Sequence, residues 1–100
     1  MEDLDHNVIE EKSKLFKVLS NNVRLCILTN LCKNGEKRVS DLQECALASQ
    51  SFVSQQLIKL KDMGIIMDRK DGVEVYYRVT DEKVKDILKK IVLEDKEWER

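Results

Sequence analysis

Hydrophobic residues recur at helical spacing along the first third of the chain. One such stripe predicts a helix from about Asp5 to Leu19, which the turn-forming tripeptide Ser20-Asn21-Asn22 interrupts. A second helix is expected from Val23 to about Lys33, and it is apolar over most of its circumference, as central helices usually are. Asn34-Gly35 should end this helix, because glycine readily adopts the left-handed conformation that closes helices.

The next segment predicts two short helices joined by a tight turn. Ser40-Asp41-Leu42-Gln43 has the pattern of a capping box, so a third helix should start at Ser40 and end near Ala46. After Leu47-Ala48, the Ser49 hydroxyl is expected to cap a fourth helix. One face of this fourth helix repeats at helical spacing and can be buried: Val53, Leu57, Leu60 and Gly64. Two helices in this arrangement predict a helix-turn-helix.

Beyond Gly64 the hydrophobic period changes to two residues, which is typical of strands. Ile65 to Lys70 is predicted to be one strand and Val73 to Val79 the next. Asp71-Gly72 between them is a hairpin signal, because both central positions of such a turn favour positive φ. Thr80-Asp81 should then cap a last helix with an apolar stripe on one side. The stripe comprises Val84, Ile87, Leu88, Ile91 and Val92, with Trp98 near the same line.

This order of elements predicts a winged helix-turn-helix, which is a mainly α fold with a β-hairpin wing (α+β). We expect one domain over residues 1–100, with frayed ends at about 1–4 and 94–100. A chain of this length has a small core, and small domains often gain stability by pairing. We therefore expect a dimer through the first and last helices, whose apolar faces have little core to share.

The polar face of the fourth helix is uncharged where the helix begins. Four side chains lie on or beside this face: Gln50, Ser51, Ser54 and Gln55. Glutamine can bond adenine in two places, and serine can bond a base or a phosphate. The pattern therefore favours contact with base edges and phosphates, although an ordinary surface helix with an uncharged polar face would have the same residues.

The predicted hairpin tip carries two basic residues, Arg69 and Lys70. A protruding basic tip can reach a phosphate backbone or a minor groove. Lysine and arginine also protect an edge strand from pairing with another chain. Both interpretations of these two residues are open on this stretch alone.

Composition limits the classes of function. The net charge is −1, so a DNA-binding protein of this composition must concentrate its positive charge locally, and a winged helix that contacts protein instead is the alternative. An enzyme is not expected, since the chain has no glycine-rich phosphate loop and no paired nucleophile and base. No apolar run is long enough to predict a membrane span or a signal peptide. Three cysteines without metal-finger spacing fit a reducing cytoplasm better than a disulfide framework.

A series of short motifs occurs in a fixed order between about Leu15 and Val92. They are Leu19-Ser20-Asn21, Val23-Arg24-Leu25, Val39-Ser40-Asp41-Leu42, Ser49-Gln50-Ser51, Val53-Ser54-Gln55-Gln56-Leu57, Leu60, Gly64-Ile65-Ile66, Gly72, Val75-Tyr76-Tyr77-Arg78 and Val79-Thr80. Each motif alone is weak, but together, in this order and spacing, they resemble the ArsR/SmtB family of small dimeric bacterial transcriptional repressors.

The resemblance implies a role for each candidate residue. It places the four polar residues of the fourth helix in the major groove and the two basic residues of the wing near the DNA backbone. It makes the first and last helices a homodimer interface, so the operator in double-stranded DNA should be an imperfect palindrome. The chain departs from the family at three positions: Leu47 replaces a turn glycine, Asn22 a frequent proline and Gln56 a frequent histidine. These departures affect local geometry and the operator sequence, not the fold.

Many members of the family release DNA when they bind a metal. The thiolate site of the short helix would need cysteines where this chain has Arg38 and Ser40, and Ser40 is expected to be a cap. The site in the last helix would use Asp81, Lys83, Glu94 and Glu97, but a protonated lysine amine repels metal. His6, the only histidine, lies in a terminal segment that should be solvated. We therefore expect no metal and no cofactor, and the inducer is not indicated.

The cysteines are the other candidate sensor. Cys26 and Cys32 lie about 9 Å apart along one helix, so they cannot form a disulfide while the helix is intact. Some members of the family sense persulfides or oxidants through one cysteine in the second helix and another in the last helix, where this chain has none. By default Cys26, Cys32 and Cys45 are small buried hydrophobic residues. The alternative is a thiol sensor at Cys32, near the helix end, or at Cys26.

Overall fold

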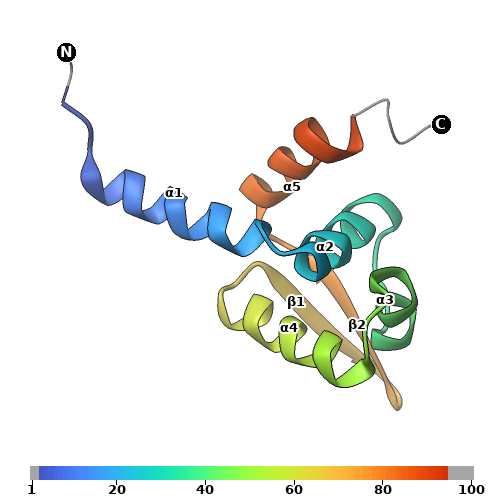
Figure 1. Ribbon diagram of the computed structural model, residues 1–100. Coiled ribbons are helices and arrows are strands. Elements are labelled where there is room, and N and C mark those ends of the chain that lie inside the picture. Colours follow the sequence, from blue (N-terminus) through green and yellow to red (C-terminus); the bar gives the residue numbers. More distant parts are fainter. Residues whose placement is uncertain (1–2, 95–100) are drawn as a thin grey trace.

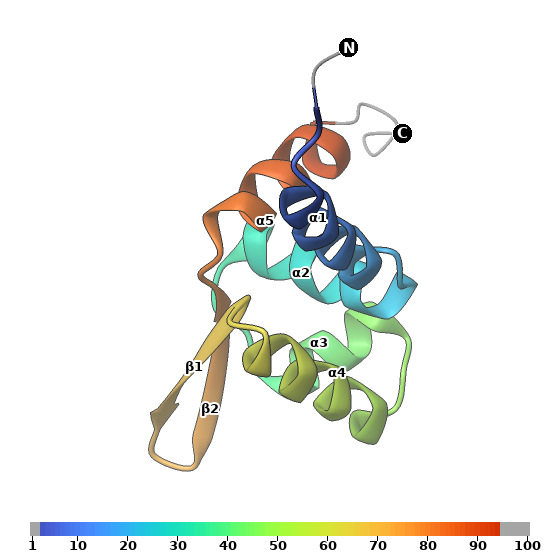
Figure 2. The ribbon, with the colours of Figure 1, turned by 90° about the vertical axis from the view of Figure 1, so that its left-hand side faces the viewer.

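The helices and strands follow one another in the predicted order. The computed structural model describes residues 3–94 and contains α1 (His6–Leu19), α2 (Asn22–Asn34), α3 (Val39–Ala46), α4 (Gln50–Asp62), β1 (Ile66–Asp71), β2 (Glu74–Val79), α5 (Glu82–Leu88) and the π-helical turn η1 (Lys89–Leu93) (Figure 1). β1 and β2 form an antiparallel hairpin beside α4, at the end of the molecule away from the start of α1 (Figure 2). The predicted winged helix-turn-helix is confirmed. Glu97 and Trp98, with most of the predicted frayed ends, lie outside the described residues.

Four helices begin at a side chain that accepts hydrogen bonds from backbone N–H groups of the first turn. These N–H groups have no partner within the helix, so a side-chain oxygen determines where the helix starts. The capping residues lie 2.9 to 3.3 Å from the nitrogen atoms that they cap: Asp5, Asn21, Ser49 and Asp81. The predicted caps at Ser49 and Asp81 are confirmed.

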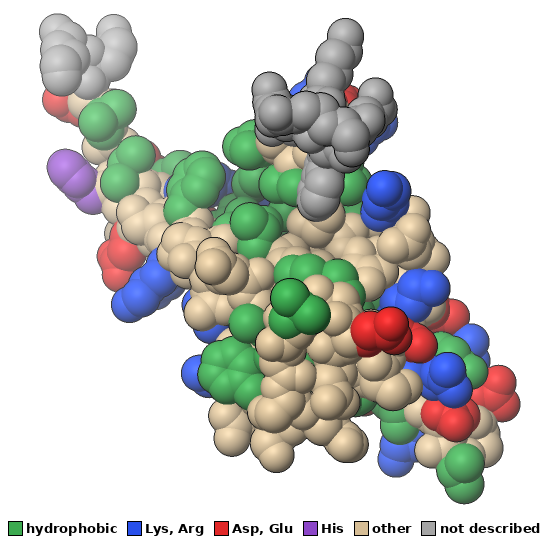
Figure 3. Space-filling model, turned by 45° about the vertical axis from the view of Figure 1, so that its right-hand side comes forward, with side chains coloured by type: hydrophobic (Ala, Val, Ile, Leu, Met, Phe, Trp, Pro, Cys, Tyr) green, Lys and Arg blue, Asp and Glu red, His purple; other side chains and the backbone are tan. Residues whose placement is uncertain are grey.

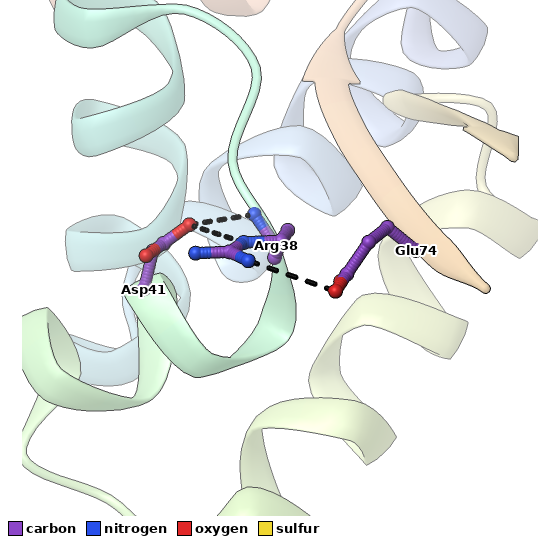
Figure 4. A network of polar contacts seen from close by, with 3 residues as sticks. All are labelled: Arg38, Asp41 and Glu74. Atoms are coloured by element: carbon purple, nitrogen blue, oxygen red, sulfur yellow. Dashed lines mark hydrogen bonds and ion pairs between the residues drawn. The ribbon is translucent and has the colours of Figure 1, made fainter. Parts of the chain in front are cut away.

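The start of α3 differs from the prediction. Ser40 lies exposed inside the first turn, and the capping position belongs to Arg38, whose backbone N–H donates to a carboxylate oxygen of Asp41 at 3.1 Å. The Arg38 guanidinium lies 3.4 Å from the same oxygen and 3.7 Å from Glu74 of β2 (Figure 4). The hydrogen bond from the Arg38 backbone, followed by that from its side chain, lowers the pKa of Asp41. The prediction that Ser40 caps this helix is wrong. α3 already begins at Val39, because the carboxylate of Asp41 accepts the hydrogen bond from the Arg38 N–H, three residues before it.

The hydrophobic core surrounds α2. Its fully buried side chains come from α2, α3, α4, β1 and α5: Ile27, Leu28, Leu42, Val53, Leu57, Leu60, Ile66, Val84 and Leu88. Three of these, on α4, confirm the predicted buried face of that helix. Gly64 does not belong to this face, because α4 ends at Asp62 and Gly64 is exposed, with φ +75°, where the chain turns toward β1.

The hairpin turn lies one residue later than predicted. The last pair of the β1–β2 ladder joins Asp71 to Glu74, so the two turn residues are Gly72 and Val73. Gly72 has φ +64°, and Val73 is 98% exposed at the tip. The prediction of an Asp71-Gly72 turn is wrong because glycine occupies the first central position, where positive φ is needed, and Asp71 keeps its place in the strand.

Candidate nucleic-acid interface

α4 presents one face to the core and the opposite face to solvent. On the outer side Gln50, Ser51 and Gln55 are exposed, and Ser54 is half-buried. All four belong to the first two turns of α4, which lies beside the hairpin (Figures 1 and 2). The structure therefore brings the four predicted residues together on one stretch of helix. Their contact with DNA stays a prediction.

The turn that leads into α4 depends on Leu47. This residue has φ +53° and is the one non-glycine residue between positions 3 and 94 with positive φ. Its side chain is 92% exposed, so it makes little packing contact that could offset the strain of a left-handed backbone. Leu47 occupies the position where the family frequently has a glycine, and the tight turn forms without one.

The two predicted basic residues of the wing differ in their surroundings. The Arg69 Nε lies 2.9 Å from both carboxylate oxygens of Glu36, and the guanidinium carbon lies 4.7 Å from the centre of the Tyr76 ring. The hydrogen bond to Glu36 raises the pKa of Arg69. Lys70 is exposed, and no ion pair within residues 3–94 involves it. Arg69 is therefore held along the hairpin, and neither residue lies at the tip itself.

Acidic and basic side chains are mixed on the wing. The Lys61 ammonium of α4 lies 3.0 Å from an Asp68 carboxylate oxygen, which ties α4 to β1. Between positions 66 and 79 three acidic residues balance three basic ones: Asp68, Asp71, Glu74, Arg69, Lys70 and Arg78. Both kinds lie side by side toward the end of the hairpin (Figure 3). The wing therefore supplies no net positive charge, and an attraction to phosphates must come from individual side chains.

Sequence reasoning missed a polar contact that positions α4. The Arg24 side chain of α2 donates from Nε to the Val18 carbonyl and from a terminal nitrogen to the Gln56 Oε1, each at 2.9 Å. Gln56 is 3% exposed and lies on the inner side of α4. This contact links the end of α1, the start of α2 and the middle of α4. The signal in the sequence was an arginine within a helix that is apolar over most of its circumference, together with a glutamine next to the buried leucine Leu57.

Replacing Gln56 with leucine should destabilise the fold. The substitution removes the acceptor of the Arg24 guanidinium and leaves a charged, half-buried donor without it, which typically costs about 1–3 kcal/mol. The neighbouring exposed glutamine offers a matched control, because Gln55→Leu alters α4 without this contact and should change the free energy of unfolding by less than about 0.5 kcal/mol. Urea denaturation followed by circular dichroism measures both. Equal stability of the two variants would show that the Arg24 contact does not hold α4.

The three cysteines do not follow the default prediction. Cys45 is exposed, and Cys26 and Cys32 are half-buried, so the expectation that all three are buried is wrong. The Cys26 and Cys45 sulfur atoms lie 2.8 Å apart. Burial raises the pKa of the Cys32 thiol. The contact was missed because it joins two helices: Cys45 follows the buried Leu42 by one helical turn and so faces α2.

The residues that were considered as metal ligands and rejected have other roles. Asp81 caps α5 and accepts from the Val84 N–H at 3.1 Å, and His6 is exposed at the start of α1. Within residues 3–94, no group of three or more histidine, cysteine, aspartate or glutamate side chains could hold a metal ion. In the same part of the chain, no helix is both long and apolar enough to cross a membrane.

A helix-turn-helix with a hairpin wing and an exposed polar second helix is the arrangement found in many transcriptional regulators that bind DNA. The model of the family "Bacterial regulatory protein, arsR family" matches residues 21–68. A "Cadmium resistance transcriptional regulatory protein CadC homolog" of Staphylococcus aureus is 38% identical over 85% of this chain and 70% of its own. An uncharacterized HTH-type transcriptional regulator of Methanocaldococcus jannaschii is 34% identical over 80% of this chain and 90% of its own.

Solved structures of similar sequence have the same fold as this chain. The AntR antimony-specific transcriptional repressor is 30% identical, with a TM-score of 0.85 over 99% of this chain and 89% of its own. NolR from Sinorhizobium fredii is 31% identical, with a TM-score of 0.78 over 91% of this chain and 93% of its own. The chain belongs to the arsR family of bacterial regulatory proteins. It is a DNA-binding transcriptional repressor and not an enzyme.

Proposed function

We propose that two copies of this chain repress transcription by binding an imperfect palindrome, with α4 of each copy in the major groove. The observation that carries the proposal is the exposed, uncharged polar stretch at the start of α4, a helix whose opposite side is fixed in the core. Gln50 and Gln55 would bond base edges, and Ser51 and Ser54 would bond a base or a phosphate. Because its target is genomic DNA, such a repressor would act in the cytoplasm.

The exposed apolar residues of α1 support a homodimer. α1 extends away from the rest of the chain (Figure 1), and only its last two residues, Val18 and Leu19, are buried. Four large apolar side chains on α1 and η1 are 44% to 64% exposed: Val8, Ile9, Phe16 and Ile91. Apolar side chains gather on the same part of the surface (Figure 3). A second copy related by a two-fold axis would cover them, and the two α4 helices would then face half-sites about one DNA turn apart.

The proposal can be tested without knowing the operator sequence, by selecting the duplexes that the protein binds from a pool of random sequences. The reduced protein should enrich a sequence with two related half-sites, and sedimentation should give a mass of two chains for the free protein. Binding to the enriched duplex should weaken steeply between low and moderate salt, because phosphate contacts release counterions. If no sequence is enriched over the random pool, the proposed reading of DNA by α4 fails, and contact with a protein becomes the explanation of the exposed helix.

The wing contributes through Lys70 in this proposal, because the Arg69 guanidinium is already paired with Glu36. Because the proposed dimer carries two copies of Lys70, Lys70→Ala should weaken binding to operator and random DNA alike and lower the slope of log affinity against log salt by about 2. Lys90→Ala removes the same charge from the exposed surface of η1 and serves as the control. Fluorescence anisotropy over a series of salt concentrations measures both slopes. Equal slopes for the two variants would mean that Lys70 contacts no phosphate.

A further inference from the structure

Two thiols from different helices meet on one side of α2. Cys26 lies in α2 and Cys45 lies near the end of α3, and their sulfur atoms are 2.8 Å apart. The Cys26 thiol also donates to the Cys45 carbonyl oxygen at 3.4 Å. A disulfide has an S–S bond of about 2.05 Å, so the two sulfur atoms would need to approach by less than about 1 Å. No comparable contact exists for Cys32 among the described residues.

We propose that Cys26 and Cys45 are a redox-active pair, which a hydroperoxide converts into a disulfide within one chain, joining α2 to α3. The pair forms a modification site apart from the polar face of α4. Reversible disulfides of this kind are the ones found in reducing compartments, where structural disulfides are rare.

A small oxidant can reach this pair. Cys45 is exposed, and an open pocket of about 530 Å³ borders both thiols. Thr29 of α2 is another residue that lines this pocket. Burial, and then the contact with Cys45, raises the pKa of Cys26 to about 11. Because Cys45 is the exposed thiol of the pair and Cys26 is half-buried, Cys45 is the sulfur that attacks first.

The reaction balances with one hydroperoxide. The Cys45 thiol loses its proton, and its sulfur attacks a peroxide oxygen; the O–O bond breaks, a sulfenic acid forms, and the leaving oxygen takes up the proton. The Cys26 sulfur then attacks the Cys45 sulfur. The S–S bond forms, the S–O bond breaks, and the proton of Cys26 leaves with the hydroxyl group as water. With hydrogen peroxide, two thiols are oxidised and two molecules of water are released.

The disulfide would act on the DNA-binding helix through the turn before it. Cys45 lies two residues before Leu47, whose left-handed backbone joins α3 to α4. Drawing the end of α3 toward α2 therefore moves the start of α4, where Gln50 and Ser51 lie. This consequence rests on the proposed function. We expect the oxidised protein to bind its operator about 5- to 150-fold more weakly, the usual size of coupling between two sites.

Mass spectrometry of the intact full chain tests the modification site without DNA. The reduced protein, treated with hydrogen peroxide under non-reducing conditions, should lose the mass of two hydrogen atoms, and a dithiol should restore it. Peptide mapping should recover one linked pair that contains Cys26 and Cys45. Cys32→Ser, the matched control, should form the same link. Cys26→Ser and Cys45→Ser should both fail to form it, while circular dichroism shows that each variant is folded.

Other outcomes separate the steps of the proposal. A link that contains Cys32, a link between two chains only, or oxidation beyond the sulfenic acid without any disulfide would overturn the assigned pair. A verified Cys26–Cys45 disulfide with unchanged operator affinity would overturn the coupling to α4 and leave the modification site in place. Failure to enrich any operator concerns the proposed function alone, because the mass measurement needs no DNA.

Discussion

Replacing Ser54 and Gln55 together with alanine should remove most of the preference of the protein for its operator over random DNA. Both side chains lie on the outer side of α4, and neither is among the fully buried residues, so the substitution leaves the core intact. Each good contact with a base edge contributes about 1–3 kcal/mol of discrimination. The proposed dimer loses four such contacts, two in each half-site, and at about 1 kcal/mol each this corresponds to a decrease on the order of 10³-fold in the ratio of operator to random affinity.

Competition binding measures this ratio directly. The labelled operator is displaced by unlabelled operator and by unlabelled random duplex, so a general loss of affinity cancels and only discrimination remains. Asn34→Ala removes an exposed amide from the end of α2 and is the control. Thermal unfolding and sedimentation should be unchanged in the double variant. An unaltered ratio would mean that the start of α4 does not read the operator, and that another element carries the specificity.

The helix and strand boundaries that were predicted correctly are those that residues close together in the sequence determine. Ser49 caps α4 because its hydroxyl accepts from an N–H three residues later, a distance that a sequence motif spans. The start of α3 was misplaced because Asp41 accepts from the Arg38 backbone and also lies beside the Arg38 guanidinium, so the helix begins before Ser40. The hairpin turn was misplaced by one residue because strand pairing determines which residues become central, and pairing is not a local property.

The missed parts of the site join residues that are far apart in the sequence. Arg24 and Gln56 are 32 residues apart, Glu36 and Arg69 are 33 apart, and the two thiols are 19 apart. Such pairs depend on how whole helices pack. For this reason Gln56 was noted only as a departure from a family pattern, and Arg69 was interpreted as a free basic residue of the wing.

These long-range contacts explain how the helix and the wing act as one unit. Arg24 of α2 donates a hydrogen bond to the buried Gln56 of α4, and the ion pair between Lys61 and Asp68 joins α4 to β1. On the other edge of the hairpin, Tyr77 of β2 exchanges two backbone hydrogen bonds with Lys37, at 2.9 and 3.1 Å. Three separate contacts therefore hold α4 and the hairpin in a fixed arrangement. Such preorganisation lowers the entropy that binding to DNA would otherwise lose.

Introducing glutamate at both Ile9 and Phe16 should convert the proposed dimer into monomers. The two side chains lie two helical turns apart on one face of α1 and are 49% and 57% exposed, so the single chain loses little by the change. In a dimer they would be covered, and a buried unpaired carboxylate is strongly unfavourable. Because a monomer holds one half-site, operator affinity should fall by about 100-fold or more, the usual gain from linking two binding sites.

Asn7→Glu with Lys14→Glu is the matched control for this prediction. These positions are also two turns apart on α1, but they lie on the opposite, polar side of the helix, and both are exposed. The control should sediment as a dimer, and the Ile9 and Phe16 variant as a monomer with an unchanged far-ultraviolet spectrum. A dimeric Ile9 and Phe16 variant with full operator affinity would place the interface elsewhere. The exposed apolar face of α1 would then be explained by contact with a different protein. Removing apolar surface from water is favourable whichever protein covers it.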